Sequence, residues 1–165
     1  MIDHMGLEGV PCANPRGVSE CCKAAKEDLE SKGFHDVSGV TVCCDGSRMA
    51  CSFFALPDDD GGKNDKTEEI IRSCITKHEI YHRDRPSATD TPKCPCECGL
   101  VYPQMDEKNL HKEECEANKL TVTCLKDGLK RCDGLATPQD IAFCKDEVQS
   151  KLESAEANVE RHCYR

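Results

Sequence analysis

Apolar residues recur at helical spacing in four segments of this chain, one near the start and three after residue 66. The first segment follows Ser19, a good helix N-cap, and ends at Gly33, a typical stop signal. Thr67 precedes acidic residues that suit the positive end of a helix dipole, and Thr137 precedes Pro138, which favours the first helical position. The predicted helices are 20–33, 67–83, 106–126 and 138–162.

Residues 36–55 change to the alternating pattern of β-strands, with Asp45-Gly46 as the turn between two strands. The polar stretch 57–65 indicates a loop, and the stretch 84–106, rich in proline and cysteine, indicates an irregular segment. This pattern predicts an α+β fold in which a small antiparallel sheet packs on about four helices. The length fits a single domain, 1–165.

Cysteine is the most unusual feature of the composition. The chain has 15 cysteines but only four Phe, three Tyr and no Trp, so it has few large side chains for a core. Such a composition is typical of a disulfide-rich scaffold, in which seven bridges would use 14 of the 15 cysteines. The alternative is a reduced protein with zinc knuckles. It is disfavoured because the cysteines do not recur in paired CxxC clusters.

Two pairs of neighbouring cysteines, Cys21-Cys22 and Cys43-Cys44, are expected to staple several segments together. A bridge between adjacent residues strains the peptide, so each cysteine should reach a different partner. Cys115 and Cys124 fall on one predicted helix, roughly 13 Å apart along its axis, which is too far for a mutual bridge. Both should therefore tie this helix to other elements.

Charge and hydropathy exclude two classes of partner. The chain has 31 acidic and 22 basic residues and a net charge of −9, whereas a nucleic-acid binder needs a basic face to neutralise phosphates. No apolar run approaches a membrane span, and no signal peptide precedes the domain. Disulfides nevertheless require an oxidising compartment. We therefore expect a secreted chain that is part of a larger exported protein, with residues 1–5 as an expression remnant.

One short motif carries chemistry: His78-Glu79-Ile80-Tyr81-His82 matches HExxH on the second predicted helix. Residues four apart share a helix face, so the two imidazoles point at the same place. Imidazole is a preferred ligand of Zn²⁺, and Glu79 lies where it can take a proton from metal-bound water. His78 and His82 also continue an apolar stripe of the helix, which turns them towards the interior.

The third predicted helix offers a further ligand. Leu110, Ala117 and Thr121 share a face with Glu113 or Glu114, so a carboxylate lies within a small or apolar stripe. A buried carboxylate must be paired or bind a metal, because an unpaired buried charge is strongly unfavourable. The spacing leaves open which glutamate is the ligand, and a solvated acidic cluster is the alternative.

The two motifs together resemble the gluzincin family of zinc metallopeptidases. HExxH is followed about thirty residues later by Glu114-Cys115-Glu116-Ala117-Asn118, which is similar to the ExxA(D/N) pattern of the second gluzincin helix. The resemblance implies zinc ligands at His78, His82 and Glu114, a general base at Glu79, and orientation of a ligand histidine by Asn118. It implies hydrolysis of peptide bonds on a minimal zincin-like fold.

Small zincin domains of this kind occur as toxins or effectors of bacterial exported proteins. The resemblance therefore implies a protein or peptide substrate and a cognate inhibitor or immunity protein as partners. One more group should stabilise the oxyanion that forms on the substrate. The candidates are Tyr81, His111, His162 and Tyr164, and His111 is the first choice because it lies one turn before Glu114.

Two other functions compete with this reading. One is a non-enzymatic, disulfide-knit binding protein in which HExxH is accidental or holds a structural metal, with Cys74 as a fourth ligand. The other is a zinc-ribbon module for nucleic acid on Cys94, Cys96 and Cys98, which the acidic charge and the CxCxC spacing disfavour. A catalytic zinc site has three protein ligands and an open position, whereas a structural site has four.

Overall fold

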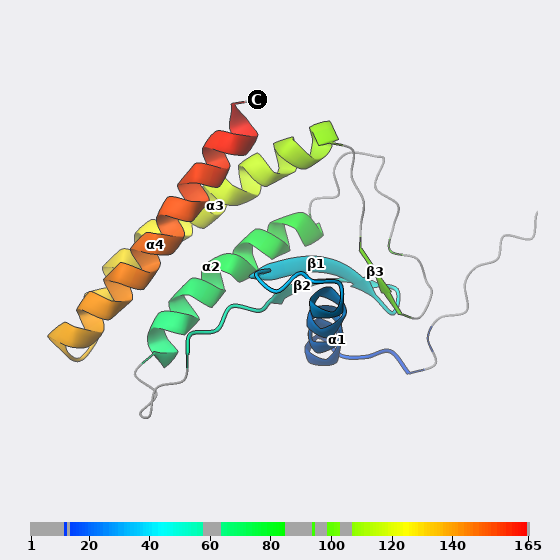
Figure 1. The fold of residues 1–165 in the computed structure, drawn as a ribbon, viewed down its shortest axis with the longest axis horizontal. Coiled ribbons are helices and arrows are strands. Elements are labelled where there is room, and N and C mark those ends of the chain that lie inside the picture. Colours follow the sequence, from blue (N-terminus) through cyan, green and yellow to red (C-terminus); the bar gives the residue numbers. More distant parts are fainter. Residues whose placement is uncertain are drawn as a thin grey trace, which may run out of the picture.

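The computed structural model describes residues 12, 14–57, 64–84, 94, 99–102 and 107–164. This part of the chain forms four helices and one three-stranded antiparallel sheet in the order β2-β1-β3 (Figure 1), so the predicted α+β class is confirmed. The elements are α1 Val18–Ser31, β1 Gly39–Cys44, β2 Ser47–Ser52, α2 Asp65–Asp84, β3 Leu100–Val101, α3 Glu107–Cys132 and α4 Pro138–Cys163.

The helices and the sheet form layers around α2. In Figure 1, α3 and α4 lie side by side as a hairpin, and α2 lies between this hairpin and the sheet. α1 packs on the other face of the sheet. Because side chains alternate along a strand, Val42 and Cys44 of β1 face α1, whereas Gly39 and Thr41 face α2. The sheet thus presents small and polar residues to the helix that carries HExxH.

The predicted turn joins β1 and β2. Asp45 and Gly46 have φ angles of 50° and 83°, as expected for the left-handed residues of a tight hairpin turn. The carboxylate of Asp45 accepts hydrogen bonds from the Arg16 side chain and from the backbone N–H of Gly99. It thereby holds the start of β3, whose Leu100 pairs with Cys44. The sequence did not predict β3, because two residues are too short to show an alternating pattern.

Two of the predicted helix caps are wrong and one is confirmed. α1 is capped by Gly17 rather than Ser19, although Gly33 follows its end with the left-handed φ of 88° that a stop signal requires. α2 begins at Asp65, so Thr67 lies inside its first turn and is buried there. The hydroxyl of Thr137 caps α4 by accepting the backbone N–H of Asp140.

α3 extends six residues beyond its predicted end at Lys126 and reaches Cys132. Gly128, which weakens a helical pattern in sequence, is required here by close packing. A Cβ atom at this position would lie 2.9 Å from a methyl group of Ile70 and 3.4 Å from one of Val148. The glycine therefore lets α2 and α4 approach α3 closely, and the main core, which includes Ile71, forms between these helices.

Six disulfides connect the described elements. They are Cys21–Cys44, Cys22–Cys51, Cys43–Cys94, Cys74–Cys124, Cys115–Cys163 and Cys132–Cys144. Cys12 is also disulfide-bonded, and Cys96 and Cys98 lie outside the described residues. Adjacent cysteines reach different partners, and Cys115 and Cys124 each tie α3 to another helix, as predicted. The protein is disulfide-rich, which is compatible with an oxidising compartment.

Across the ranges that the structure describes, no helix has both the length and the apolar composition needed to cross a bilayer.

Candidate metal centre

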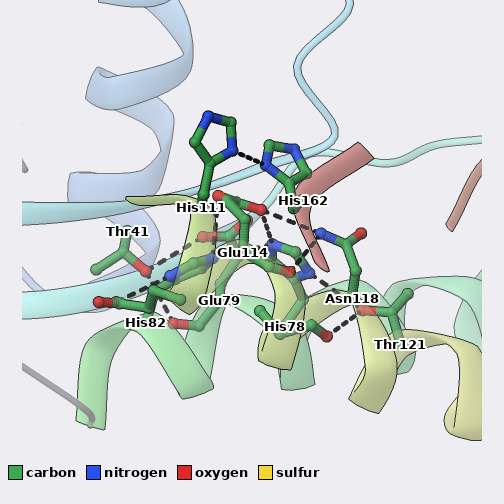
Figure 2. Close-up of polar contacts among 11 residues, drawn as sticks. Thr41, His78, Glu79, His82, His111, Glu114, Asn118, Thr121 and His162 are labelled. Carbon is green, nitrogen blue, oxygen red and sulfur yellow. Dashed lines mark hydrogen bonds and ion pairs between the residues drawn. The ribbon is translucent and has the colours of Figure 1, made fainter. Parts of the chain in front are cut away.

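The two histidines of the motif converge from one face of α2. His78 and His82 lie one turn apart, and their Nε2 atoms are 3.1 Å from each other. The planes of the two imidazole rings meet at 62°, with ring centroids 4.8 Å apart, so the rings contact each other through their edges (Figure 2). Both side chains are largely shielded from solvent.

Glu114 of α3 completes the group. Its Oε2 lies 3.5 Å from Nε2 of His78, and its Oε1 lies 3.3 Å from Nε2 of His82. A tetrahedral zinc ion with ligand bonds of about 2.0–2.2 Å separates neighbouring donor atoms by roughly 3.3–3.6 Å. The three predicted ligands therefore lie at separations that fit one bound metal ion, and the group could hold one.

The proton of His78 is positioned by Thr121. Nδ1 of His78 lies 3.1 Å from Oγ1 of Thr121, and this hydroxyl donates its own hydrogen to the carbonyl of Ala117 at 3.0 Å. Since the hydroxyl proton is already used, Thr121 must accept a hydrogen bond from Nδ1–H. Nε2 of His78 then keeps a lone pair that points at the metal position.

Glu113 positions the proton of His82. Its Oε1 lies 3.0 Å from Nδ1 of His82, and only 7% of its side chain is exposed. The carboxylate accepts Nδ1–H and so leaves Nε2 of His82 as a donor for a metal. Glu113 is thus neither a solvated surface charge nor a member of the ligand group. Its role was missed because the sequence does not show which glutamate faces which ring nitrogen.

Asn118 does not orient a histidine, which corrects the expectation from the family resemblance. Its amide donates to the carboxylate of Glu114 at 3.1 Å and to the backbone carbonyl of Glu114 at 2.8 Å. The residue lies four positions after Glu114 on the same helix, so its side chain reaches back to the ligand carboxylate. Asn118 therefore positions Glu114, while Thr121 and Glu113 position the imidazoles.

Glu79 is fixed between α2 and the sheet. Its side chain is buried, and the hydroxyl of Thr41 on β1 lies 3.1 Å from its Oε2 and 2.8 Å from its backbone carbonyl. A Cβ atom on Gly39 would lie 2.9 Å from its Oε1, so only glycine leaves room for the carboxylate there. Burial raises the pKa of Glu79, against the opposite influence of His78 and His82.

The remaining charges of the group are strongly coupled. Burial would lower the pKa of His82, but the carboxylates of Glu114 and Glu113 outweigh it and raise the pKa to about 9. Burial would likewise raise the pKa of Glu114. The neighbouring imidazoles of His78 and His82 outweigh that effect and hold this pKa well below its usual range. Without a metal, the group therefore favours an imidazolium beside an ionised carboxylate.

No protein-family model, no curated protein and no solved structure matches this chain.

The predicted oxyanion residue His111 lies next to the group but not within it. One turn before Glu114 on α3, its Nδ1 contacts Nδ1 of His162 on α4 at 2.8 Å (Figure 2). Its Nε2 faces the exposed carboxylate of Glu107 at 3.7 Å. Two of the four oxyanion candidates thus form one pair, while Tyr164 is largely exposed at the end of α4.

Disulfide bonds rule out two of the alternative metal sites. Cys74 is bridged to Cys124, so it is not a fourth ligand, and Cys94 is bridged to Cys43, so it cannot belong to a zinc ribbon. The only other potential ligand cluster within the described ranges contains Cys21 and Cys44, which are bridged to each other. Three protein ligands at His78, His82 and Glu114 match the number found in catalytic zinc sites.

Proposed function

We propose that this protein is a zinc-dependent peptidase. The observation that carries the proposal is the arrangement of two oriented imidazoles and one carboxylate around a common point, with a buried carboxylate at Glu79 beside it. Two nitrogen donors and one oxygen donor suit Zn²⁺, and three protein ligands leave one position for water and substrate.

Glu79 is the general base of the proposed reaction. A zinc ion in the site would lower the pKa of a water molecule and polarise the substrate carbonyl. The carboxylate of Glu79 takes the proton from the water that attacks the carbonyl. Glu79 then passes this proton to the nitrogen of the leaving amine as the C–N bond breaks.

The His111–His162 pair is the proposed donor to the oxyanion. Its support is its position one turn before Glu114 and its ring nitrogens, which can donate hydrogen bonds. Because the two imidazoles contact each other, the loss of either ring should disturb the other.

The biological setting is proposed from the disulfides and from the resemblance. Six bridges are compatible with secretion, and small zincin domains act as toxins or effectors within larger exported proteins. The substrate would then be a protein or peptide, and a cognate inhibitor or immunity protein would be a natural partner.

Glu79→Gln tests the proposed function. The amide cannot accept the water proton, so peptide hydrolysis should fall at least about 100-fold, while zinc content should stay that of the wild type. The measurements are zinc content and cleavage of a protein substrate such as casein by zinc-loaded protein. A wild type that binds zinc but cleaves nothing would favour the non-enzymatic binding protein. Full activity in the variant would remove Glu79 from the mechanism.

A further inference from the structure

A cavity of about 270 Å³ extends from the metal group between α2 and α4, over α3. His78 and Glu79 line one end, so the cavity is continuous with the position where the reaction would occur. This volume suits one amino-acid side chain better than a larger ligand.

The helix directions define the long axis of the cavity. α3 is antiparallel to α4, because Cys115 bridges to Cys163 whereas Cys132 bridges to Cys144. It is also antiparallel to α2, so α2 and α4 run parallel to each other.

Because α2 and α4 run parallel, each end of the cavity is lined by residues from both of these helices. At the metal end lie His78 of α2 and Asn158 of α4. At the other end lie Ile71 and Lys151, each seven residues earlier on its helix. At 1.5 Å per residue, the two ends are roughly 10 Å apart.

The walls change in character along this axis. The middle is apolar, with Ile75, Leu125 and Ala155 among the lining residues. At the far end, the ammonium group of Lys151 lies 4.8 Å above the ring of Phe54. Such a contact fixes the long side chain in place.

The ammonium group of Lys151 has no carboxylate partner among the described residues. Within the ranges that the structure describes, no carboxylate forms an ion pair with Lys151. By contrast, Lys145 on the same helix pairs with Asp133, and Lys126 pairs with Glu156. The far end of the cavity is therefore lined by a lysine whose ammonium group contacts an aromatic ring and forms no ion pair with the described carboxylates.

We infer that this cavity receives the substrate side chain next to the scissile bond and selects glutamate there. The inference rests on the proposed peptidase function. The methylene groups of a glutamate would contact the apolar walls, and its carboxylate would pair with Lys151. Between apolar walls this pair is stronger than an exposed one. Aspartate is too short to reach the lysine, glutamine lacks the charge, and a substrate lysine is repelled.

The binding of inhibitors tests this inference without any turnover. The probes are dipeptide hydroxamates, which chelate zinc, differing only in a side chain of Glu, Gln, Leu or Lys. Calorimetry on zinc-loaded wild type should show the Glu compound binding about tenfold or more tightly than the Gln compound, and the Lys compound binding most weakly.

Two substitutions and a matched control identify the residue responsible. Lys151→Met keeps an unbranched side chain over Phe54 and should abolish the difference between the Glu and Gln compounds. Lys151→Glu should reverse the order of the Glu and Lys compounds. Lys145→Glu makes the same charge change on the same helix outside the cavity and should leave the order unchanged.

Failure of the inference and failure of the proposed function give different results. Equal affinities for the Glu and Gln compounds in zinc-loaded wild type, or an unchanged order in Lys151→Glu, would overturn the glutamate pocket and leave the metal centre intact. A wild type that takes up no zinc and binds no hydroxamate would overturn the proposed function, and the pocket with it.

Discussion

At the scale of single residues, the site is defined by where each imidazole keeps its proton. Thr121 accepts from Nδ1 of His78 and Glu113 accepts from Nδ1 of His82, so the Nε2 atoms can offer lone pairs to a metal ion that Glu114 also reaches. Neither partner belongs to the HExxH motif. The motif supplies two of the three potential ligands, and residues on the facing helix orient their imidazoles.

The glutamates at positions 113, 114 and 116 of α3 have different expected roles. Glu114→Gln should weaken zinc binding at least about tenfold, because an amide oxygen is a poorer zinc ligand than a carboxylate. Glu113→Gln should cost less, since its amide oxygen still accepts Nδ1–H of His82. Glu116→Gln should change nothing, because Glu116 pairs with Lys119 at the surface. Competitive titration with a zinc chelator measures all three. A larger loss in Glu113→Gln than in Glu114→Gln would exchange the two roles.

The coupled charges of the empty site predict a pH dependence of stability. The pKa of His82 is raised from 6.5 to about 9, so the stability that it contributes is complete below pH 6.5 and is lost as the pH rises through 9. The pKa of Glu114 is lowered from 4.5, so its contribution is present above pH 4.5 and is lost in stronger acid. Metal-free protein should therefore lose stability between pH 6.5 and 9.

Zinc should reverse this alkaline trend, because the metal competes with the proton on His82. Thermal unfolding in a chelator and in excess zinc, at several pH values between 6 and 9, gives both curves. The stabilisation by zinc should grow with pH, and His82→Gln should remove the alkaline loss in the metal-free protein. A metal-free protein with the same melting temperature at pH 6 and pH 9 would contradict the assigned coupling.

At the scale of elements, the metal centre depends on the crossing of α2 and α3. The disulfide Cys74–Cys124 fixes this crossing, since Cys74 lies one turn before His78 and Cys124 lies near Thr121. Cys132–Cys144 joins α3 to α4 near the opposite end of α3. The two bridges therefore provide a matched pair for experiment.

Replacing Cys74 and Cys124 by serine together should lower both thermal stability and zinc affinity. Opening this loop, with a sequence separation of 50, should cost about 4 kcal/mol of unfolding free energy in the chain-entropy model. The same change at Cys132 and Cys144, separated by 12, should cost about 3 kcal/mol and leave zinc affinity unchanged. Melting curves and zinc titrations measure both effects. Equal zinc affinities in the two variants would show that the bridge does not hold the site.

Much of the fold was predictable because its helices and hairpin are local patterns. The hairpin at Asp45-Gly46 and the cap at Thr137 depend on neighbouring residues only, and both were predicted. The end of α3 was not predicted, because glycine disfavours a helix in sequence. The close packing of Ile70 that requires Gly128 is visible only in the fold. β3 was missed because a two-residue strand has no pattern of its own.

The candidate site likewise has residues that local spacing predicts and residues that only the fold brings together. His78, Glu79 and His82 could be found because their spacing is set by one helix. The support for Glu79 comes from Gly39 and Thr41 of the sheet, which lie far away in the sequence. Such contacts depend on tertiary packing, and spacing along the chain does not reveal them.

At the scale of the whole molecule, disulfides compensate for the small number of large side chains. Several of the fully buried side chains are cysteines, and bridges link α1 to the sheet and α3 to both of its helical neighbours. A domain of this size can then keep polar residues such as Glu79, Glu113 and Asn118 inside it. The net charge of −9 concerns the whole molecule, whereas the inferred glutamate pocket depends on the local charge of Lys151.

X-ray absorption at the zinc edge would reveal the ligands of a zinc ion held by His78, His82 and Glu114. The sample is disulfide-intact protein, stripped of metal and then reloaded with one equivalent of zinc. We expect one zinc per chain with about four nitrogen and oxygen ligands at roughly 2.0–2.2 Å. We also expect a lower zinc affinity in His78→Ala. A sulfur shell near 2.3 Å, or failure of the wild type to retain zinc, would contradict this zinc site.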